Sequence, residues 1–235
     1  CGSLFDREKE EECYRYLREK RICGILLGSY TYDATMLSSQ DFPVVTIGYK
    51  LAKSIPAVRT DNYSIGRIAA KHLLSKGCKK LLYITGYLGG PKEDLRYKGF
   101  AEELALRQCE SWIYEINMDM QLVNDFSGII SQMILEHPDA DGVFAETDAL
   151  AMNCIQIYLG LGYRIPQDLK VIGYGNLQFS IFSNPQLTLV QENTKEIARK
   201  AISLLIEMIE TGKNGSQSLP QEIIVPVSLN ERKTT

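Results

Sequence analysis

Hydrophobic and polar positions along this chain alternate between two periods. Short apolar runs such as Ile22–Gly28 and Val44–Ile47 predict buried strands. Between them lie stretches with an apolar residue every three or four positions, which predict helices that cover a sheet. Further strands are expected at 81–84, 112–116, 142–145, 170–173 and 222–228, and helices at 8–20, 62–77, 94–107, 126–136, 147–159 and 193–212. Strands that alternate with helices predict parallel sheets with helices on both faces.

The number of strands indicates how these sheets are organised. The strand candidates are too many for one ordinary doubly wound sheet in 235 residues. We therefore predict an α/β fold with two doubly wound parallel-sheet subdomains. Ligands of such sheets bind beyond the carboxyl ends of the strands. This rule selects the segments after Ile47, Ile84, Ala145 and Gly173 as places to look for a site, and facing loop ends would enclose a hinged cleft.

Two sequence signals predict where individual helices begin. Asn62 precedes an apolar-striped run that ends at Gly77, which predicts a helix capped by the Asn62 side chain. Asn193 and Glu196 form a capping box, because an amide and a carboxylate three residues apart can satisfy two orphan N–H groups. The helix that follows Asn193 should end at Gly212.

Composition and charge narrow the class of protein. Hydrophobic residues make up 45% of the chain and charged residues 23%, which is typical of a globular protein, and the formal net charge is −3. No basic stripe is present, so this segment is not expected to contact DNA. No apolar run approaches the roughly 18 residues of a membrane span, and no signal peptide is visible. We therefore expect a cytoplasmic protein with no membrane contact.

The cysteines and histidines do not indicate chemistry. Six cysteines are scattered without a CxxC pair, so we expect reduced, buried thiols and neither a metal site nor a cofactor. The sequence shows no G-x-S-x-G elbow, no phosphate-binding P-loop and no zinc spacing. The glycine-rich stretch 86–90 lacks the spacing of a dinucleotide loop. These observations favour a binding protein over an enzyme.

Ordered motifs extend over nearly the whole chain. They are, in order, Val58–Gly66 with Asp61-Asn62, His72–Gly77, Arg96–Phe100 in the form R-x-x-G-F, Thr147–Met152, Gly162–Tyr174 with Ile165-Pro166, Pro185–Thr188 and Arg232–Thr235. Each motif is short, but their order resembles that of the lactose/galactose-repressor family of bacterial transcription regulators. On this resemblance the chain is the small-molecule-sensing core of a repressor.

The resemblance implies a fold similar to periplasmic sugar-binding proteins, with three crossovers between two subdomains. One subdomain would comprise residues 1–60 with 190–217, and the other residues 61–189 with 218–235. An effector, expected to be a sugar or a derivative, would bind in the cleft and change the affinity for operator DNA. The family also implies a homodimer. The alternative is a solute-binding receptor of a sugar transport system, which has the same fold.

The resemblance also implies parts that this sequence does not show. A helix-turn-helix DNA-binding head and the first strand and helix of the core are expected but not found. Cys1-Gly2-Ser3 resembles the end of the second strand, and Leu4–Lys20 fits the second helix. We therefore expect a fragment, or another element that fills the place of the first strand.

Arg96 is the leading candidate for ligand binding, because it begins the helix after strand 81–84. A guanidinium there can donate two hydrogen bonds to vicinal hydroxyls or to a carboxylate. Asp148 and Thr147 open the helix after strand 142–145. They either contact the ligand, as the family position of Asp148 implies, or act only as helix caps.

Two departures from the family bear on the ligand. Gly48 and Gly175 stand where sugar-responsive members commonly carry an acid. Asn176 or Tyr49 could supply the missing contacts, or the ligand could differ, or the site could be degenerate. Tyr87 follows a strand and could stack on a sugar face.

Overall fold

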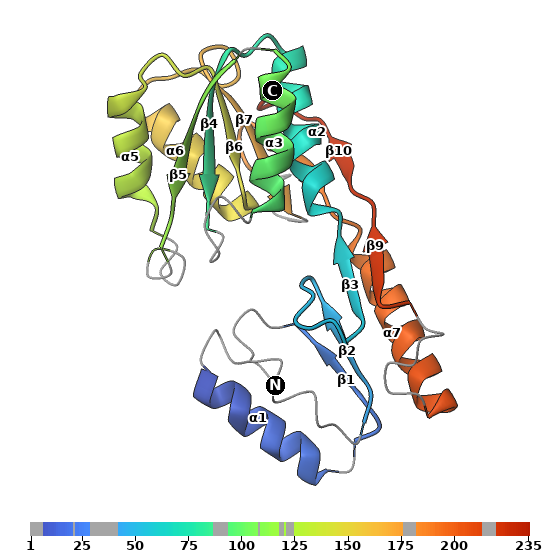
Figure 1. Cartoon of the computed structure of the whole chain (residues 1–235). Coiled ribbons are helices and arrows are strands. Elements are labelled where there is room, and N and C mark those ends of the chain that lie inside the picture. Colours follow the sequence, from blue (N-terminus) through green and yellow to red (C-terminus); the bar gives the residue numbers. More distant parts are fainter. Residues whose placement is uncertain are drawn as a thin grey trace. The chain divides into compact units, whose positions relative to one another are not determined.

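The computed structural model describes residues 7–20, 22–28, 42–86, 94–107, 109–117, 120, 125–175, 182–212 and 220–235 (Figure 1). Its helices are α1 (Arg7–Glu19), α2 (Asn62–Ser75), α3 (Leu95–Ala105), α5 (Ser127–Glu136), α6 (Asp148–Gly160) and α7 (Thr194–Thr211). Its strands are β1 (Ile25–Leu27), β2 (Val44–Ile47), β3 (Ala57–Thr60), β4 (Lys80–Thr85), β5 (Glu110–Glu115), β6 (Gly142–Ala145), β7 (Lys170–Gly175), β8 (Thr188–Gln191), β9 (Glu222–Val225) and β10 (Ser228–Asn230).

The chain forms two compact units. The first comprises Cys1–Thr60 with Asn193–Val225, and the second Asp61–Glu192 with Pro226–Thr235. The prediction of two α/β sheet subdomains joined by three crossovers is confirmed, and the crossovers fall after Thr60, Glu192 and Val225.

Two segments lie in a different unit from the one expected. Residues 218–225 were assigned to the second subdomain, but β9 pairs in parallel with β3, which places this segment in the first unit. Residues 190–192 were assigned to the first, but β8 pairs with β7 in the second unit. The boundary expected between residues 217 and 218 is therefore wrong, since it falls after Val225. Residues 213–219 themselves lie outside the described part of the chain.

The second unit is built on a six-stranded sheet of order β10-β8-β7-β6-β4-β5, parallel except for β10. Successive residues of β4 point to opposite faces, as in any strand. Leu82 and Ile84 pack in one buried cluster with α5 and α6, whereas Leu81 and Tyr83 pack in another with α2 and α3. All four side chains are fully buried. Helices therefore cover both faces of this sheet.

Two glycines let α2 and α3 approach unusually closely. A Cβ at Gly66 would lie 1.8 Å from the backbone oxygen of Arg96, and one at Gly99 would lie 2.1 Å from that of Tyr63. No side chain larger than a hydrogen fits at either position. The glycines of two of the recognised motifs therefore set the position of α3, and with it the position of Arg96.

The first unit has a smaller sheet of four parallel strands, in the order β1-β2-β3-β9. One face packs on α7, whose buried residues are Ile197, Ala201, Leu204 and Met208. A smaller cluster around Phe42, Val44 and Ile55 includes partly buried residues of β1. The strand expected at Ile22–Gly28 is limited to Ile25–Leu27, and it is half-buried rather than buried.

Several local predictions need correction. Asp61, not Asn62, is the N-cap of α2, because its carboxylate accepts from the Ser64 N–H at 3.1 Å. The strand expected at 222–228 is two strands, β9 and β10, in different sheets. Strands β3 and β8 were not predicted as strands. The Asn193 cap of α7 and its end at Gly212, which has φ of +60°, follow the prediction.

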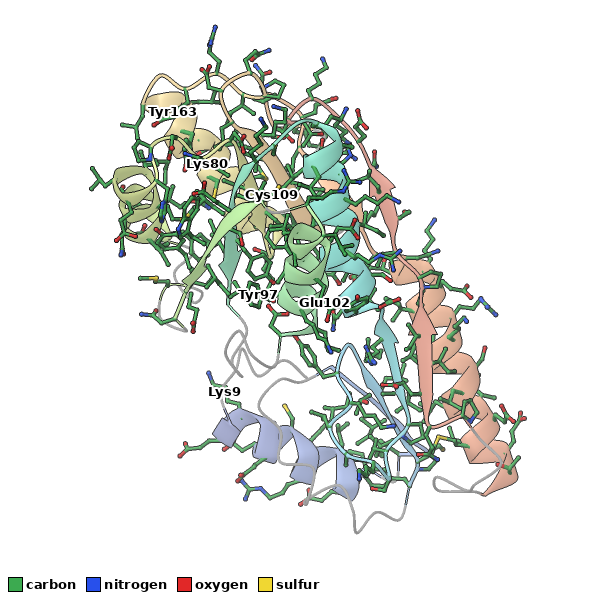
Figure 2. The ribbon with its side chains drawn as sticks, turned by 45° about the horizontal axis from the view of Figure 1, so that its top comes forward. Lys9, Lys80, Tyr97, Glu102, Cys109 and Tyr163 are labelled. Carbon is green, nitrogen blue, oxygen red and sulfur yellow. The ribbon has the colours of Figure 1, made fainter. Side chains whose placement is uncertain are left out.

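The thiols differ in exposure. Cys78 and Cys154 are buried, and burial raises the pKa of each to about 12. Cys23 is exposed, so the expectation of buried cysteines is wrong there; it lies just before the short strand β1. Cys13 and Cys109 are partly buried, and Figure 2 shows Cys109 next to β5. Across the described residues, no helix combines the length and apolar character needed to cross a membrane.

Candidate functional site

Polar side chains gather at the carboxyl edge of the six-stranded sheet in the second unit. Arg96 lies in the first turn of α3, which follows β4 in the chain. Asp94 caps this helix, and its carboxylate accepts from the Arg96 N–H at 2.8 Å. Glu146 follows β6, and Tyr174 lies near the end of β7. Because the carboxyl ends of parallel strands meet at one edge, these residues from distant parts of the sequence lie together.

Three neighbouring side chains contact the Arg96 guanidinium. Its Nη1 donates to Glu146 Oε1 at 2.7 Å, and its Nε donates to Asn62 Oδ1 at 3.0 Å. The guanidinium carbon lies 4.4 Å from the centre of the Tyr174 ring, at cation–π distance. The Arg96 and Glu146 side chains are only 12% and 8% exposed. This arrangement fixes the direction of the guanidinium before any ligand binds.

The carboxylates of Glu146 and Asp94 are joined by the Thr85 side chain. Thr85 Oγ1 lies 2.7 Å from Glu146 Oε2 and 3.1 Å from Asp94 Oδ2. Glu146 also accepts from the Gly86 N–H, and the Tyr83 hydroxyl donates to Asp94 Oδ2 at 2.6 Å. Burial, together with the charges of Glu146 and Asp94, holds the pKa of the Tyr83 phenol well above its usual value. Tyr83 therefore remains a neutral donor in this network.

Thr147 and Asp148 open α6 in different roles. Thr147 Oγ1 accepts from the Leu150 N–H at 3.1 Å and caps the helix. The Asp148 carboxylate accepts from the Ala149 N–H at 2.8 Å. A Cβ at Gly175 would lie only 2.4 Å from Asp148 Oδ2, so the Asp148 carboxylate takes up the space where a side chain at 175 would begin. The helix-cap alternative is therefore observed for Thr147, whereas Asp148 reaches across to the end of β7.

The end of β7 is tied to the strand beside it. Tyr174 donates its hydroxyl hydrogen to Glu192 Oε2 at 2.7 Å, and the Glu192 N–H donates to the Gly175 oxygen. Gly175 has φ of +150°, which few side-chain-bearing residues adopt. Both the backbone conformation and the neighbouring Asp148 carboxylate therefore favour glycine at position 175.

The described structure does not place the other predicted site residues relative to Arg96. Asn176 and Tyr87 lie outside the described residues. Tyr49 follows β2 in the first unit and is partly buried. Its neighbour Gly48 has φ of +89°, and its N–H donates to the Val58 oxygen at 3.0 Å, so a turn in the backbone explains this glycine.

Several members of the cluster were not predicted as site residues from the sequence, namely Asn62, Asp94, Glu146, Tyr174 and Glu192. One signal was available for Glu146, because it directly follows a strand end that had been selected for inspection. Asn62 was taken as a helix cap, but Asp61 fills that role and leaves the Asn62 amide oxygen to accept from Arg96. For Glu192 the sequence offers no signal, since β8 itself was not predicted.

The cluster carries several kinds of group that can recognise polar ligands. It offers carboxylate acceptors, one guanidinium and an aromatic ring, the groups that orient polar ligands in binding sites. Among the described residues there is no group of three or more His, Cys, Asp and Glu side chains placed to hold a metal ion.

Figure 2 shows Tyr97 and Glu102 on α3, the helix that also carries Arg96. There the Tyr63 hydroxyl of α2 donates to Glu102 Oε2 at 2.6 Å and ties the two helices together.

Comparison with characterised proteins gives consistent relatives. The ribose operon repressor of Halalkalibacterium halodurans is 28% identical over all of this chain and 69% of the relative's length. The sucrose operon repressor of Streptococcus mutans is also 28% identical, over 97% of this chain and 68% of the relative. A PurR transcriptional repressor of Haemophilus influenzae is 27% identical over 96% of this chain and 68% of the relative. These relatives are transcriptional regulators, as the motif resemblance implied.

A solved structure agrees with these relatives. The periplasmic binding protein/LacI transcriptional regulator from Alkaliphilus metalliredigens, complexed with D-xylulofuranose, superposes with a TM-score of 0.86 and 27% identity. The match covers all of this chain and 86% of the other. Residues 70–235 also match the family described as periplasmic binding protein-like domain. The chain therefore belongs to the periplasmic binding protein-like domain family, and the relatives that it resembles along nearly its whole length are transcriptional repressors.

Proposed function

We propose that this chain senses a sugar or sugar derivative for a transcriptional repressor, and that the ligand binds at the carboxyl edge of the six-stranded sheet. The observation that carries the proposal is Arg96, which Glu146, Asn62 and Tyr174 hold in place at that edge. A donor fixed in this way loses little conformational freedom when hydroxyl groups bind to it. The relatives named as ribose and sucrose operon repressors, and the solved relative with bound D-xylulofuranose, support the same ligand class.

Each residue would make a different kind of contact with the ligand. Arg96 would donate to hydroxyl oxygens, while Asp148 would accept from hydroxyl groups, and Thr147 would position Asp148 by capping α6. Tyr49, Tyr87 and Asn176 remain predicted ligand contacts. The relatives named above are transcriptional repressors rather than enzymes, so we propose binding without catalysis.

The ligand would act by binding one conformation of the regulator more tightly than another. A helix-turn-helix head would read the operator, and a homodimer in the cytoplasm would present two such heads. A sugar-transport receptor could be built on the same fold, but the names of the curated relatives favour a regulator. Sedimentation at micromolar concentration tests the dimer, and a monomer there would contradict it.

A thermal-shift screen with sugars tests the function. A ligand at 100 times its dissociation constant stabilises a protein by about 2.7 kcal/mol, which raises the melting midpoint measurably. A sugar should shift the wild type but not Arg96→Ala. Arg67→Ala is the matched control, since Arg67 is an exposed arginine on the neighbouring helix α2. If no sugar moves a cooperatively melting wild type, or if Arg96→Ala responds fully, the proposal is wrong.

A further inference from the structure

The chain passes between its two units at three crossovers, and two of them lie next to residues of the Arg96 cluster. The first crossover follows Thr60, and the second follows Glu192. Asn62 is the second residue after the first crossover, and Glu192 is the last residue before the second. Both residues have side-chain contacts that lead back to Arg96. Side chains at the proposed site therefore also contact the segments that join the two units.

The connection to the first crossover is direct. Arg96 Nε donates to Asn62 Oδ1 at 3.0 Å. Asn62 is the first residue of α2, and Asp61 caps that helix by accepting from the Ser64 N–H. Because this cap fixes the first turn of α2, the Asn62 side chain and the backbone at the crossover move together. A displacement of the Arg96 guanidinium therefore acts on the backbone two residues from the point where the chain changes unit.

The connection to the second crossover has two steps. The guanidinium carbon of Arg96 lies 4.4 Å from the centre of the Tyr174 ring. The Tyr174 hydroxyl donates to Glu192 Oε2 at 2.7 Å, and the Glu192 N–H donates to the Gly175 oxygen at 3.3 Å. Hydrogen bonds to a carboxylate are among the stronger ones in proteins. Tyr174 and Gly175 thus contact Glu192 through its side chain and through its backbone.

The residue after Glu192 belongs to the first unit and begins a helix. Asn193 is the N-cap of α7, and its side-chain oxygen accepts from the Glu196 N–H at 3.0 Å. Helix α7 supplies buried residues to the core of the first unit. Glu192 and Asn193 are joined by one planar peptide bond. A change in the contact between Tyr174 and Glu192 therefore reaches the cap of α7 over a single residue.

We infer that Arg96 restrains two crossovers, the first through Asn62 and the second through Tyr174 and Glu192, and that it thereby couples ligand binding to the conformation of the hinge. Tyr174 and Glu192 are positioning residues in this inference, because they act through Arg96 and the backbone. A ligand on Arg96 shifts the hinge by binding one of its conformations more tightly than another. The inference rests on the proposed function, since it assigns the regulation of the same site.

Hydrogen–deuterium exchange of the whole chain, measured by mass spectrometry, tests the restraint without a ligand. Peptides covering residues 58–64 and 188–194 report the two crossovers. Arg96→Ala should speed exchange in both peptides. Tyr174→Phe keeps the ring and should speed exchange only in 188–194, by about tenfold for the loss of one hydrogen bond to a carboxylate. Glu192→Ala should act like Tyr174→Phe, whereas Glu192→Gln keeps an oxygen that accepts from Tyr174 and should stay closer to the wild type.

Tyr114→Phe is the matched control. It also removes a hydroxyl that donates to a glutamate, Glu136, but it lies on β5, the edge strand farthest from β8 and β10. Exchange at both crossovers should match the wild type, and acceleration equal to that in Tyr174→Phe would contradict the restraint. Wild-type rates at 188–194 in Tyr174→Phe would overturn the inference, and this result is decisive even if Arg96→Ala fails to fold.

A second measurement adds a sugar. The probes are D-ribose, D-xylulose and sucrose, the sugars that appear in the names of the relatives above. A sugar that raises the melting midpoint of the wild type should slow exchange at both crossovers when it saturates the protein. In Tyr174→Phe, also saturated, it should slow exchange in 58–64 but no longer in 188–194. Loss of the response at one crossover alone is not expected if Tyr174 only stabilises the fold.

The outcomes separate this inference from the proposed function. If a sugar binds but leaves exchange at the crossovers unchanged, the coupling is wrong while the sugar-sensing function stands. The same holds if the sugar slows exchange in 188–194 equally in the wild type and in Tyr174→Phe. If no sugar binds to cooperatively folded wild type, the proposed function fails and the coupling fails with it.

Discussion

The two units of this protein bury their sheets to different degrees. In the second unit the central strand β4 is buried on both faces, by α5 and α6 on one side and by α2 and α3 on the other. In the first unit the inner strands β2 and β3 are also largely buried, but the edge strand β1 is half-buried, and Ile224 of the other edge strand, β9, is 47% exposed. Helix α7 also leaves Ile202, Ile206 and Ile209 exposed. Because burial of apolar surface is the main source of stability, we expect the second unit to be the more stable of the two.

This difference matters for the site. Arg96, Glu146 and Asp148 all belong to the unit that is buried on both faces. A binding residue is most precise on an element that packing holds rigid. The proposed binding residues therefore lie in the unit whose central strand is packed on both faces.

Thiol labelling should show the largest contrast between the units. The exposed Cys23 of the first unit should react with iodoacetamide in the native protein, whereas Cys78 and Cys154 of the second should not. A pKa of about 12 leaves few thiolates at neutral pH, lowering reactivity by about a thousandfold before burial adds protection. Peptide mapping by mass spectrometry reads each cysteine separately. Native labelling of Cys154 at a rate close to that of Cys23 would contradict the comparison.

A cavity made in the first unit should let that unit unfold at a lower urea concentration than the second unit. Leu204→Ala removes a buried side chain of α7 and should cost about 3 kcal/mol. Trp112, the only tryptophan, lies on β5 of the second unit, so its fluorescence follows that unit, whereas circular dichroism follows both. In urea the dichroism should begin to change at lower concentration than the fluorescence. Ile206→Ala on the exposed face of α7 is the control and should change stability by less than about 0.5 kcal/mol.

A methyl group between α2 and α3 should weaken the second unit. Gly99→Ala forces the two helices apart, because its Cβ would meet the Tyr63 oxygen at 2.1 Å, and it should cost about 2 kcal/mol. Tryptophan fluorescence in urea measures this cost. Gly128→Ala, at an exposed position of α5 with open space around it, should be neutral or stabilise by up to about 1 kcal/mol. Equal behaviour of the two variants would show that the close approach is not a constraint.

The smallest expected effect is a loss of stability in mild acid. Burial lowers the pKa of His72 below its ordinary 6.5, against the pull of Glu231 and with the help of Lys76. The unfolded chain therefore binds more protons than the folded one just below pH 6.5, so stability falls as the pH drops through that value. The melting midpoint of the wild type should fall more between pH 7.5 and 5.5 than that of His72→Gln. Parallel pH profiles would exclude this contribution.

The fold was largely predictable because its hydrophobic periods are local. The alternation of apolar strands with amphipathic helices predicted two parallel sheets, and the ordered motifs identified the family. Strands β3 and β8 were missed, since four-residue strands at the crossovers carry little periodicity. Residues 218–225 were assigned to the wrong subdomain, because the pairing of β9 with β3 joins segments more than 160 residues apart.

The site was predictable only where a motif marked it. Arg96, Thr147 and Asp148 follow strand ends and match family positions, so the sequence by itself determined them as candidates. Only the tertiary structure decided that Glu146 pairs with Arg96, that Asn62 accepts from it, and that Asp148 takes the space beside Gly175. Sequence fixes the period and capping of each element through short-range sterics and hydrogen bonds. Which charges meet at a sheet edge depends on strand order, and strand order is a long-range property that no local pattern contains.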